Sequence, residues 1–225
     1  MNVKAGTLSA ALRERTSTLH RQAERTGFVG ALLKGRGTLD GYASLLRGLL
    51  PVYEAMENAL ATHTKSNGVG LLALPAVYRT EAIRADLEEI SAATEFEPPA
   101  LSAAEHYAER VRMAGAGDGA RLIAHAYTRY LGDLNGGRVL RTQLAKTLSL
   151  DPKALSFFDF PDIDDVRAFV ASYRARIDQA GESLHNRDAI LEESAQAFRC
   201  NIALSEAIET QVAARCESGS EAVNA

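Results

Sequence analysis

Apolar residues recur along this chain at the three- and four-residue spacing of an amphipathic α-helix. In the first such stretch, Leu8, Leu12, Leu19 and Ala23 share one face. No segment alternates Val, Ile or Thr with polar residues over the length of a strand, and Ala, Leu, Glu and Arg dominate. The sequence therefore predicts an all-α fold, a compact bundle of about eight helices with short connections.

Turn and capping residues indicate where the helices begin and end. Thr38 is a suitable N-cap, Gly35 is a stop signal, and Ser102-Ala-Ala-Glu105 has the pattern of a capping box. Gly and Pro dominate residues 66–75, which predicts a loop. The expected helices cover residues 7–25, 28–34, 38–62 with a kink at Pro51, 80–90, a helix opening at 102, 118–148 with an interruption at 132–137, a helix opening at 162, and 188–216.

Length and charge limit the possible classes of protein. The chain of 225 residues fits a single domain over 1–225, with an ordered core at about 8–215 and a polar tail at 217–225. A net charge of −4 gives no indication of nucleic-acid binding. We find no signal peptide, lipidation motif or membrane anchor, and expect a cytoplasmic protein that is a monomer. Cys200 and Cys216 are expected about 24 Å apart on one helix, too far for a disulfide.

Three glycines, Gly132, Gly136 and Gly137, fall within six residues of an otherwise strong helix. Each costs roughly 0.5–1 kcal/mol relative to Ala inside a helix. Gly132 and Gly136 are one turn apart and clear the same face, so a flat ligand or another backbone could approach it beside Asp133. Two interpretations stay open here: close helix–helix packing with a solvent-facing Asp133, or a ligand site on a kinked helix.

The first helix contains a candidate metal ligand. His20 lies at the edge of the apolar face, and Glu24 one turn later can accept a hydrogen bond from its ring, as metal-binding imidazoles require. Arg13 lies on nearly the same face, about 10 Å away along the axis. A ring system with a central metal and carboxylates at its rim would fit His20 and Arg13. A purely structural histidine is the alternative.

With these residues in view, the sequence resembles the heme oxygenase family, of soluble bacterial type, over residues 8–209. The segment His125-Ala-Tyr-Thr-Arg-Tyr-Leu-Gly-Asp-Leu-Asn-Gly-Gly137 looks like the family's signature. Four further pieces match in the family's order: Leu19-His-Arg-Gln-Ala-Glu24, Leu32-Leu-Lys-Gly35, Tyr173-Arg-Ala-Arg176 and Ala197-Phe-Arg-Cys-Asn201.

The resemblance implies an enzyme that opens haem (heme) at a meso carbon with O2, giving biliverdin, CO and Fe2+. Haem would be both substrate and cofactor. His20, beside Glu24, would bind the iron, while Asp133 would hold a distal water network with Tyr53 and Arg129. The other implied haem contacts are Gly132 and Gly136 on the distal face, Arg13, Tyr127, Thr128 and Arg174 at the propionates, and Phe28, Val29, Phe198 and Asn201 along the pocket.

Four positions depart from the family's pattern. Ser17 stands where some members carry a propionate-binding Lys, and Val170 is a second loss of that kind. Asn135 stands where Ser is common, and Ser205 where an aromatic pocket residue is often found. These departures bear on the orientation of the haem, and so on which meso carbon is attacked.

Other interpretations were compared with this one. A haem-binding carrier or sensor with the same fold would not need a distal network at Asp133. Glu182-Ser-Leu-His185 matches the Glu-x-x-His pattern of di-iron bundles, but there is no second copy and a turn is favoured. For His125 we favour a buried histidine bonded to a neighbouring helix over a distal group. The chain has no flavin or nicotinamide motif, so a separate ferredoxin or flavoprotein reductase would supply the electrons. The sequence leaves open which donor serves it, the biliverdin isomer, and whether the product serves iron acquisition or bilin supply.

Overall fold

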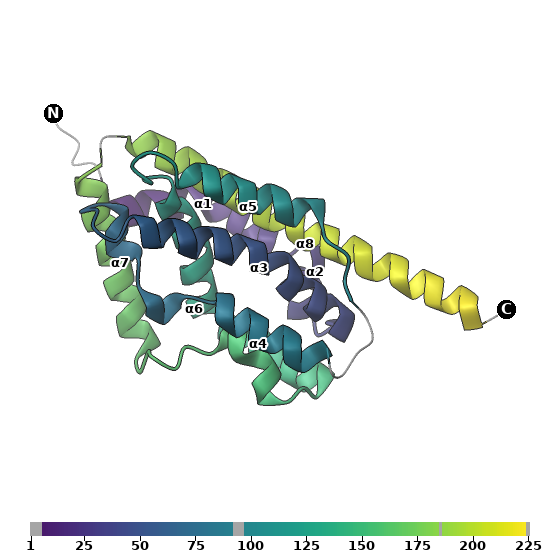
Figure 1. Ribbon diagram of the computed structural model, residues 1–225. Coiled ribbons are helices and arrows are strands. Elements are labelled where there is room, and N and C mark those ends of the chain that lie inside the picture. Colours follow the sequence, from purple (N-terminus) through teal and green to yellow (C-terminus); the bar gives the residue numbers. More distant parts are fainter. Residues whose placement is uncertain (1–5, 92–96, 185, 224–225) are drawn as a thin grey trace.

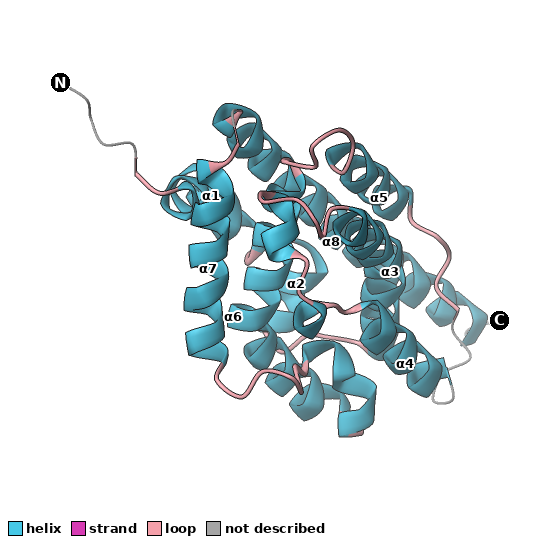
Figure 2. Ribbon diagram, turned by 60° about the vertical axis from the view of Figure 1, so that its left-hand side comes forward, coloured by secondary structure: helices cyan, strands magenta, loops and turns pink. Residues whose placement is uncertain are grey.

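The computed structural model describes residues 6–91, 97–184 and 186–223. In these ranges the chain forms eight α-helices and three short 3-10 segments, with no strand, so the predicted all-α fold is confirmed (Figures 1 and 2). The helices are α1 (Leu8–Ala23), α2 (Gly27–Leu33), α3 (Leu39–Thr62), α4 (Thr80–Ser91), α5 (Ser102–Ala114), α6 (Leu122–Leu148), α7 (Val166–Glu182) and α8 (Arg187–Val223), and the 3-10 segments are η1 (Val69–Leu72), η2 (Pro75–Val77) and η3 (Pro152–Phe158).

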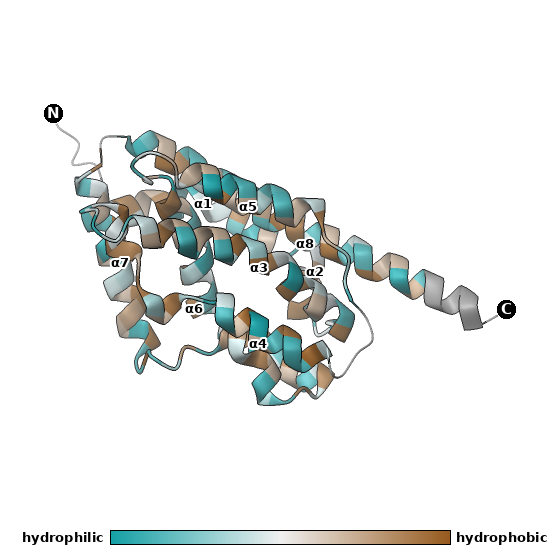
Figure 3. Cartoon of the chain, in the orientation of Figure 1, coloured by the Kyte–Doolittle hydropathy of each residue, from teal (hydrophilic) through white to brown (hydrophobic). Residues whose placement is uncertain are grey.

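The core lies around α3, which packs against α4, α5, α6 and α8. Its largest fully buried side chains are aromatic: Tyr42, Tyr53, Tyr107, Tyr130, Tyr173 and Phe157. The sides of α4 and α5 turned to the viewer in Figure 3 are largely hydrophilic, as expected for helices with one buried face. None of the described helices combines the length and apolar character needed to cross a bilayer.

Several predicted limits are wrong. α6 runs from Leu122 to Leu148 without the interruption expected at 132–137, because each glycine costs only about 0.5–1 kcal/mol, too little to break a long helix. α7 begins at Val166 rather than at 162, since the carboxylate of Asp165 accepts the backbone N–H of Ala168. α8 continues beyond the predicted end at 216, and in Figure 1 its end projects past the other helices.

The predicted capping box at the start of α5 is also wrong. Ser102 is the first helical residue, and Leu101 occupies the N-cap position without a side-chain hydrogen bond. Two other capping residues act as predicted. The Thr38 hydroxyl accepts a hydrogen bond from the N–H of Gly41 at the start of α3. Gly35, just after the end of α2, has φ +71°, the left-handed conformation that commonly ends a helix.

α1 and α6 are held together through shared neighbours rather than by packing directly on each other. Both helices pack against α2, α7 and α8, yet they make little contact with each other. α8 bridges them, because it packs along α1 and also along α6. α8 therefore connects the first helix, which carries the candidate metal ligand, to the glycine-bearing helix.

Candidate functional site

Four polar side chains from three helices form a buried network. Nε of Arg129 donates to the Tyr53 hydroxyl at 3.0 Å, and Nη2 donates to Oδ1 of Asp133 at 3.0 Å. Nη1 of Arg129 donates to Oδ1 of Asn201 on α8 at 2.6 Å. The Tyr53 hydroxyl in turn donates to Oδ2 of Asp133. Arg129 therefore joins α3, α6 and α8 and uses all three of its guanidinium nitrogens.

Burial sets the protonation of this network. Desolvation raises the pKa of Asp133, while the nearby charges of Arg129 and, more weakly, Arg79 oppose that rise. Desolvation also raises the pKa of Tyr53 well above its ordinary value, so the phenol keeps its proton and acts as donor. Desolvation alone would lower the pKa of Arg129, but the hydrogen bond to Tyr53 and the attraction of Asp133 raise it above its ordinary value. Arg129 therefore remains a cation.

Two glycines of α6, Gly132 and Gly136, face open space. A Cβ built on Gly132 or on Gly136 would have no neighbouring atom within 4 Å, whereas one on Gly137 would lie 3.3 Å from the Phe158 ring. Asp133 is 9% exposed and bonded to Arg129. The interpretation as close helix packing beside a solvent-facing Asp133 is therefore wrong on both counts.

His20 lies on the open side of α1. Its Nδ1 is 3.6 Å from Oε1 of Glu24, and both side chains are more than half exposed. The centroid of its ring is 5.9 Å from that of Phe198 on α8. Nε2 of His20 has no hydrogen-bond partner in the described part of the chain. Phe198 and Asn201 thus place the same helix beside His20 and, one turn later, beside Arg129.

The residues predicted to contact the propionates differ in their exposure to solvent. Arg13 and Arg174 are exposed, as residues at the rim of a site would be, and Tyr127 is half-buried. Thr128 is buried, and its hydroxyl donates to the Ala124 carbonyl of its own helix.

Phe28 is buried on α2. Its ring packs on Gly41 of α3, where a Cβ would lie 2.2 Å from it. Val29, the next residue, is half-buried.

His125 belongs to a different cluster, as the favoured interpretation predicted. Its Nε2 lies 3.0 Å from Oε1 of Glu193 on α8, and Arg110 of α5 donates to both carboxylate oxygens of Glu193. Sequence reasoning missed Glu193 and Arg110, because neither stands in a recognisable motif. Their only signal was an acidic residue and a basic residue on faces that are otherwise apolar.

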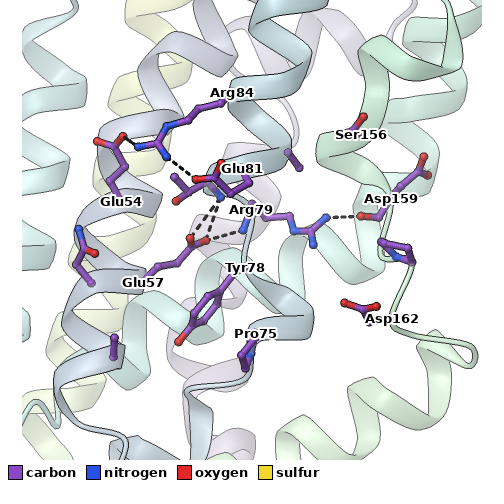
Figure 4. A pocket seen from close by; sticks show the side chains of 15 residues that line it. Glu54, Glu57, Pro75, Tyr78, Arg79, Glu81, Arg84, Ser156, Asp159 and Asp162 are labelled. Atoms are coloured by element: carbon purple, nitrogen blue, oxygen red, sulfur yellow. Dashed lines mark hydrogen bonds and ion pairs between the residues drawn. The ribbon is translucent and has the colours of Figure 1, made fainter.

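An open groove of about 1050 Å³ lies elsewhere, between α3, the start of α4 and η3. In Figure 4, Arg84 reaches Glu54 and Glu81, and the guanidinium of Arg79 points to the Asp159 carbonyl. None of the predicted site residues lines this groove. Among the described residues no group of three or more His, Cys, Asp or Glu could hold a metal ion, and His185 of the Glu182–His185 pattern lies outside them.

Comparison with known proteins identifies related sequences. Residues 6–207 match the family model described as Heme oxygenase. Heme oxygenase 1 of Nostoc sp. is 34% identical over 204 residues, which cover 90% of this chain and 86% of that protein. Human heme oxygenase 1 is 34% identical over 213 residues, covering 90% of this chain and 72% of that protein.

Solved structures agree with this result. Heme oxygenase-1 from the cyanobacterium Synechocystis, in complex with heme, superposes with a TM-score of 0.84 at 31% identity and covers 97% of this chain and 100% of its own. The heme oxygenase from Leptospira interrogans gives a TM-score of 0.82 at 32% identity, covering 89% of this chain and 99% of its own.

Proposed function

Because the chain belongs to the heme oxygenase family, we propose that it binds haem between α1 and α6 and opens it at a meso carbon. The products would be biliverdin, CO and Fe2+, with O2 as co-substrate. Haem serves as substrate and cofactor, and when bound it supplies both the iron that activates O2 and the carbon that is oxidised.

One observation carries the proposal. Gly132 and Gly136 leave open space on α6, and the residue between them, Asp133, turns its carboxylate into a buried network. A flat ligand can lie against the glycine backbone, with an acid–base group at its edge. A helix that only packs on another helix would have its glycine faces covered and would not need a buried ion pair beside them.

The chemistry of the residues on α1 fits haem. A single imidazole on an open face suits an iron already held by a porphyrin, whereas a metal caged by protein needs three or four ligands. We propose that Nε2 of His20 binds the iron and that Glu24, near Nδ1, holds the ring in orientation. Phe198 packs beside His20 and keeps water from that side of the ring.

On the opposite side, Asp133 would order the water that supplies a proton. Each of its carboxylate oxygens already accepts one hydrogen bond, from Arg129 or from Tyr53, and has a further lone pair for water. Arg129, held by Asn201, keeps the carboxylate in place. Asp133 is too short to reach across the glycine face, so it acts through that water.

The rim residues and partners complete the proposal. Arg13 and Arg174 would meet the propionates, with Tyr127 and Thr128 beside them and Val29 along the pocket. Electrons would come from a ferredoxin or flavoprotein reductase. A single domain over 1–225, a monomeric state and a cytoplasmic location stay predictions, which limited proteolysis, size-exclusion chromatography and cell fractionation would test.

The testing experiment adds haemin and a reductant to the protein under air and follows the Soret band. We expect the band to disappear and a new absorption in the red to appear, which marks ring opening. A shifted Soret band that persists would identify a carrier or sensor instead. A band that never shifts would contradict haem binding altogether. The His20→Ala variant is the matched control for ligation.

A further inference from the structure

The first turn of α2 is capped by a residue of another helix. Thr26 occupies the N-cap position, but its hydroxyl donates to the Gln22 carbonyl and makes no cap. The backbone N–H of Val29, third residue of the helix, donates instead to the hydroxyl of Ser205 on α8 at 3.0 Å. The Ser205 hydroxyl is 3.3 Å from the Thr26 carbonyl, to which it donates. One hydroxyl therefore accepts from the first turn of α2 and donates to the residue before it.

The backbone at this corner is pressed against α8. Gly27 has φ +64°, and a Cβ there would lie 2.4 Å from the carbonyl carbon of Ser205. Ser205 itself is 3% exposed. A larger side chain at Gly27 therefore has no room.

The same corner begins directly after the turn that carries His20. The N–H groups of Arg25 and Thr26 both donate to the Gln22 carbonyl, which ties the end of α1 to the corner. α8 touches this segment again through Phe198, whose ring lies beside that of His20. Phe198 and Ser205 are two turns apart on α8, so they share one face of it.

We propose that Ser205 is a positioning residue for the iron-binding side of the haem site. Its hydroxyl holds the α1–α2 corner against α8. It thereby fixes the position of Val29 and the direction in which the His20 side chain points from α1. The inference rests on the proposed function for the role of His20. In the sequence, Ser205 is notable only because an aromatic pocket residue is often found at this position in the family. Its two hydrogen bonds show that the hydroxyl also holds the start of α2.

The test compares Ser205→Ala with Ser194→Ala. Ser194 is also buried on α8, but its hydroxyl donates only to the Leu191 carbonyl of its own helix. In the haem-free protein we expect the Val29 amide to exchange with solvent about fivefold faster in Ser205→Ala than in Ser194→Ala, as for a lost helix cap. In the ferrous haem complex we expect the iron–imidazole stretching band in the resonance Raman spectrum to shift or broaden in Ser205→Ala alone.

The outcomes distinguish the helix cap at Val29 from the positioning role of Ser205. Unchanged exchange at Val29 in Ser205→Ala would overturn the cap. Faster exchange with an unchanged iron–imidazole band would overturn the positioning role and leave Ser205 a structural cap only. If the wild-type protein bound haem without histidine ligation, the assignment of His20 would fail, and with it the positioning role, while the exchange measurement would still decide the cap.

Discussion

Nη2 of Arg129 donates to Oδ1 of Asp133, one turn later on α6, over 3.0 Å, and each residue is 9% exposed. Such a pair is expensive to desolvate, and a protein seldom keeps one for stability alone. Its place beside two uncovered glycines explains why it is kept here. It supplies a fixed carboxylate at the edge of an open face.

Asp133→Ala should lower the yield of biliverdin on the order of 100-fold, the usual contribution of a general acid or base. Haem affinity should stay nearly unchanged, because Asp133 contacts neither iron nor propionate in the proposed site. Asp133→Asn should be intermediate, since an amide still bonds water but carries no charge. Single-turnover absorption with H2O2 on wild type and both variants measures the effect. Ring opening at the wild-type rate in Asp133→Ala would contradict the water-ordering role.

Those variants also test the ion pair. Either one leaves the Arg129 cation buried without its carboxylate, so we expect the free energy of unfolding to fall by about 3 kcal/mol. Denaturant titration gives this value independently of haem. An unchanged midpoint would show that Tyr53 and Asn201 suffice to hold Arg129.

His20→Ala should leave the fold intact, with a change in unfolding free energy within about 0.5 kcal/mol, because its side chain is 56% exposed. Haemin should then bind weakly and without a histidine-ligated spectrum, and added imidazole should restore ligation. Optical titration with and without imidazole checks this. A wild-type Soret maximum with full turnover would show that another residue binds the iron.

Arg13→Ala combined with Arg174→Ala should change the ratio of biliverdin isomers more than it changes iron ligation. Two arginine–carboxylate contacts at the rim would fix the haem about its iron axis, and their loss frees rotation. Chromatography of the products gives the ratio. Arg36→Ala, an exposed arginine after α2, is the control. The same ratio in the double variant and the control would count against propionate anchoring.

How well the sequence predicts a feature of this structure depends on how far apart along the chain the interacting residues lie. Thr38 and Gly35 marked helix ends correctly because a cap is decided within one turn. The start of α7 was misplaced because several nearby acidic residues could cap it, and only packing decides among them. The Arg129–Asn201 bond joins residues 72 apart, and no local pattern predicts such a pair. The family resemblance placed both residues at the haem site, but only the structure shows that they are bonded to each other.

The Glu193 cluster predicts how stability depends on pH. Burial would raise the pKa of Glu193, but hydrogen bonds from His125 and Arg110 lower it from 4.5 to about 2. Between these values the folded state binds fewer protons than the unfolded state, so this stabilisation is complete above pH 4.5 and disappears as the pH falls to 2. Desolvation lowers the pKa of His125, which removes further stability as the pH falls below its ordinary value of 6.5.

Glu193→Gln should therefore reduce stability at pH 7, by about 2 kcal/mol for the lost charged hydrogen bonds, and flatten the loss between pH 4.5 and 2. Glu192→Gln is the matched control, since Glu192 is the exposed neighbour on α8. Denaturant midpoints at steps of pH give both curves. Equal slopes for the two variants in this range would show that Glu193 titrates normally.

Gly132→Ala should separate stability from activity by moving them in opposite directions. An added Cβ meets no atom within 4 Å, so the folded protein gains helix propensity without a clash, about 1 kcal/mol in unfolding free energy. The same methyl group occupies the face against which the haem is proposed to lie, so turnover should fall on the order of tenfold or more, as for a small displacement of a reacting group. Gly137→Ala is the comparison, because its Cβ would press on Phe158 at 3.3 Å away from the open face. Thermal denaturation of the haem-free variants and the Soret assay measure the two effects. A Gly132→Ala protein that is both more stable and fully active would show that the open face of α6 is not where haem binds.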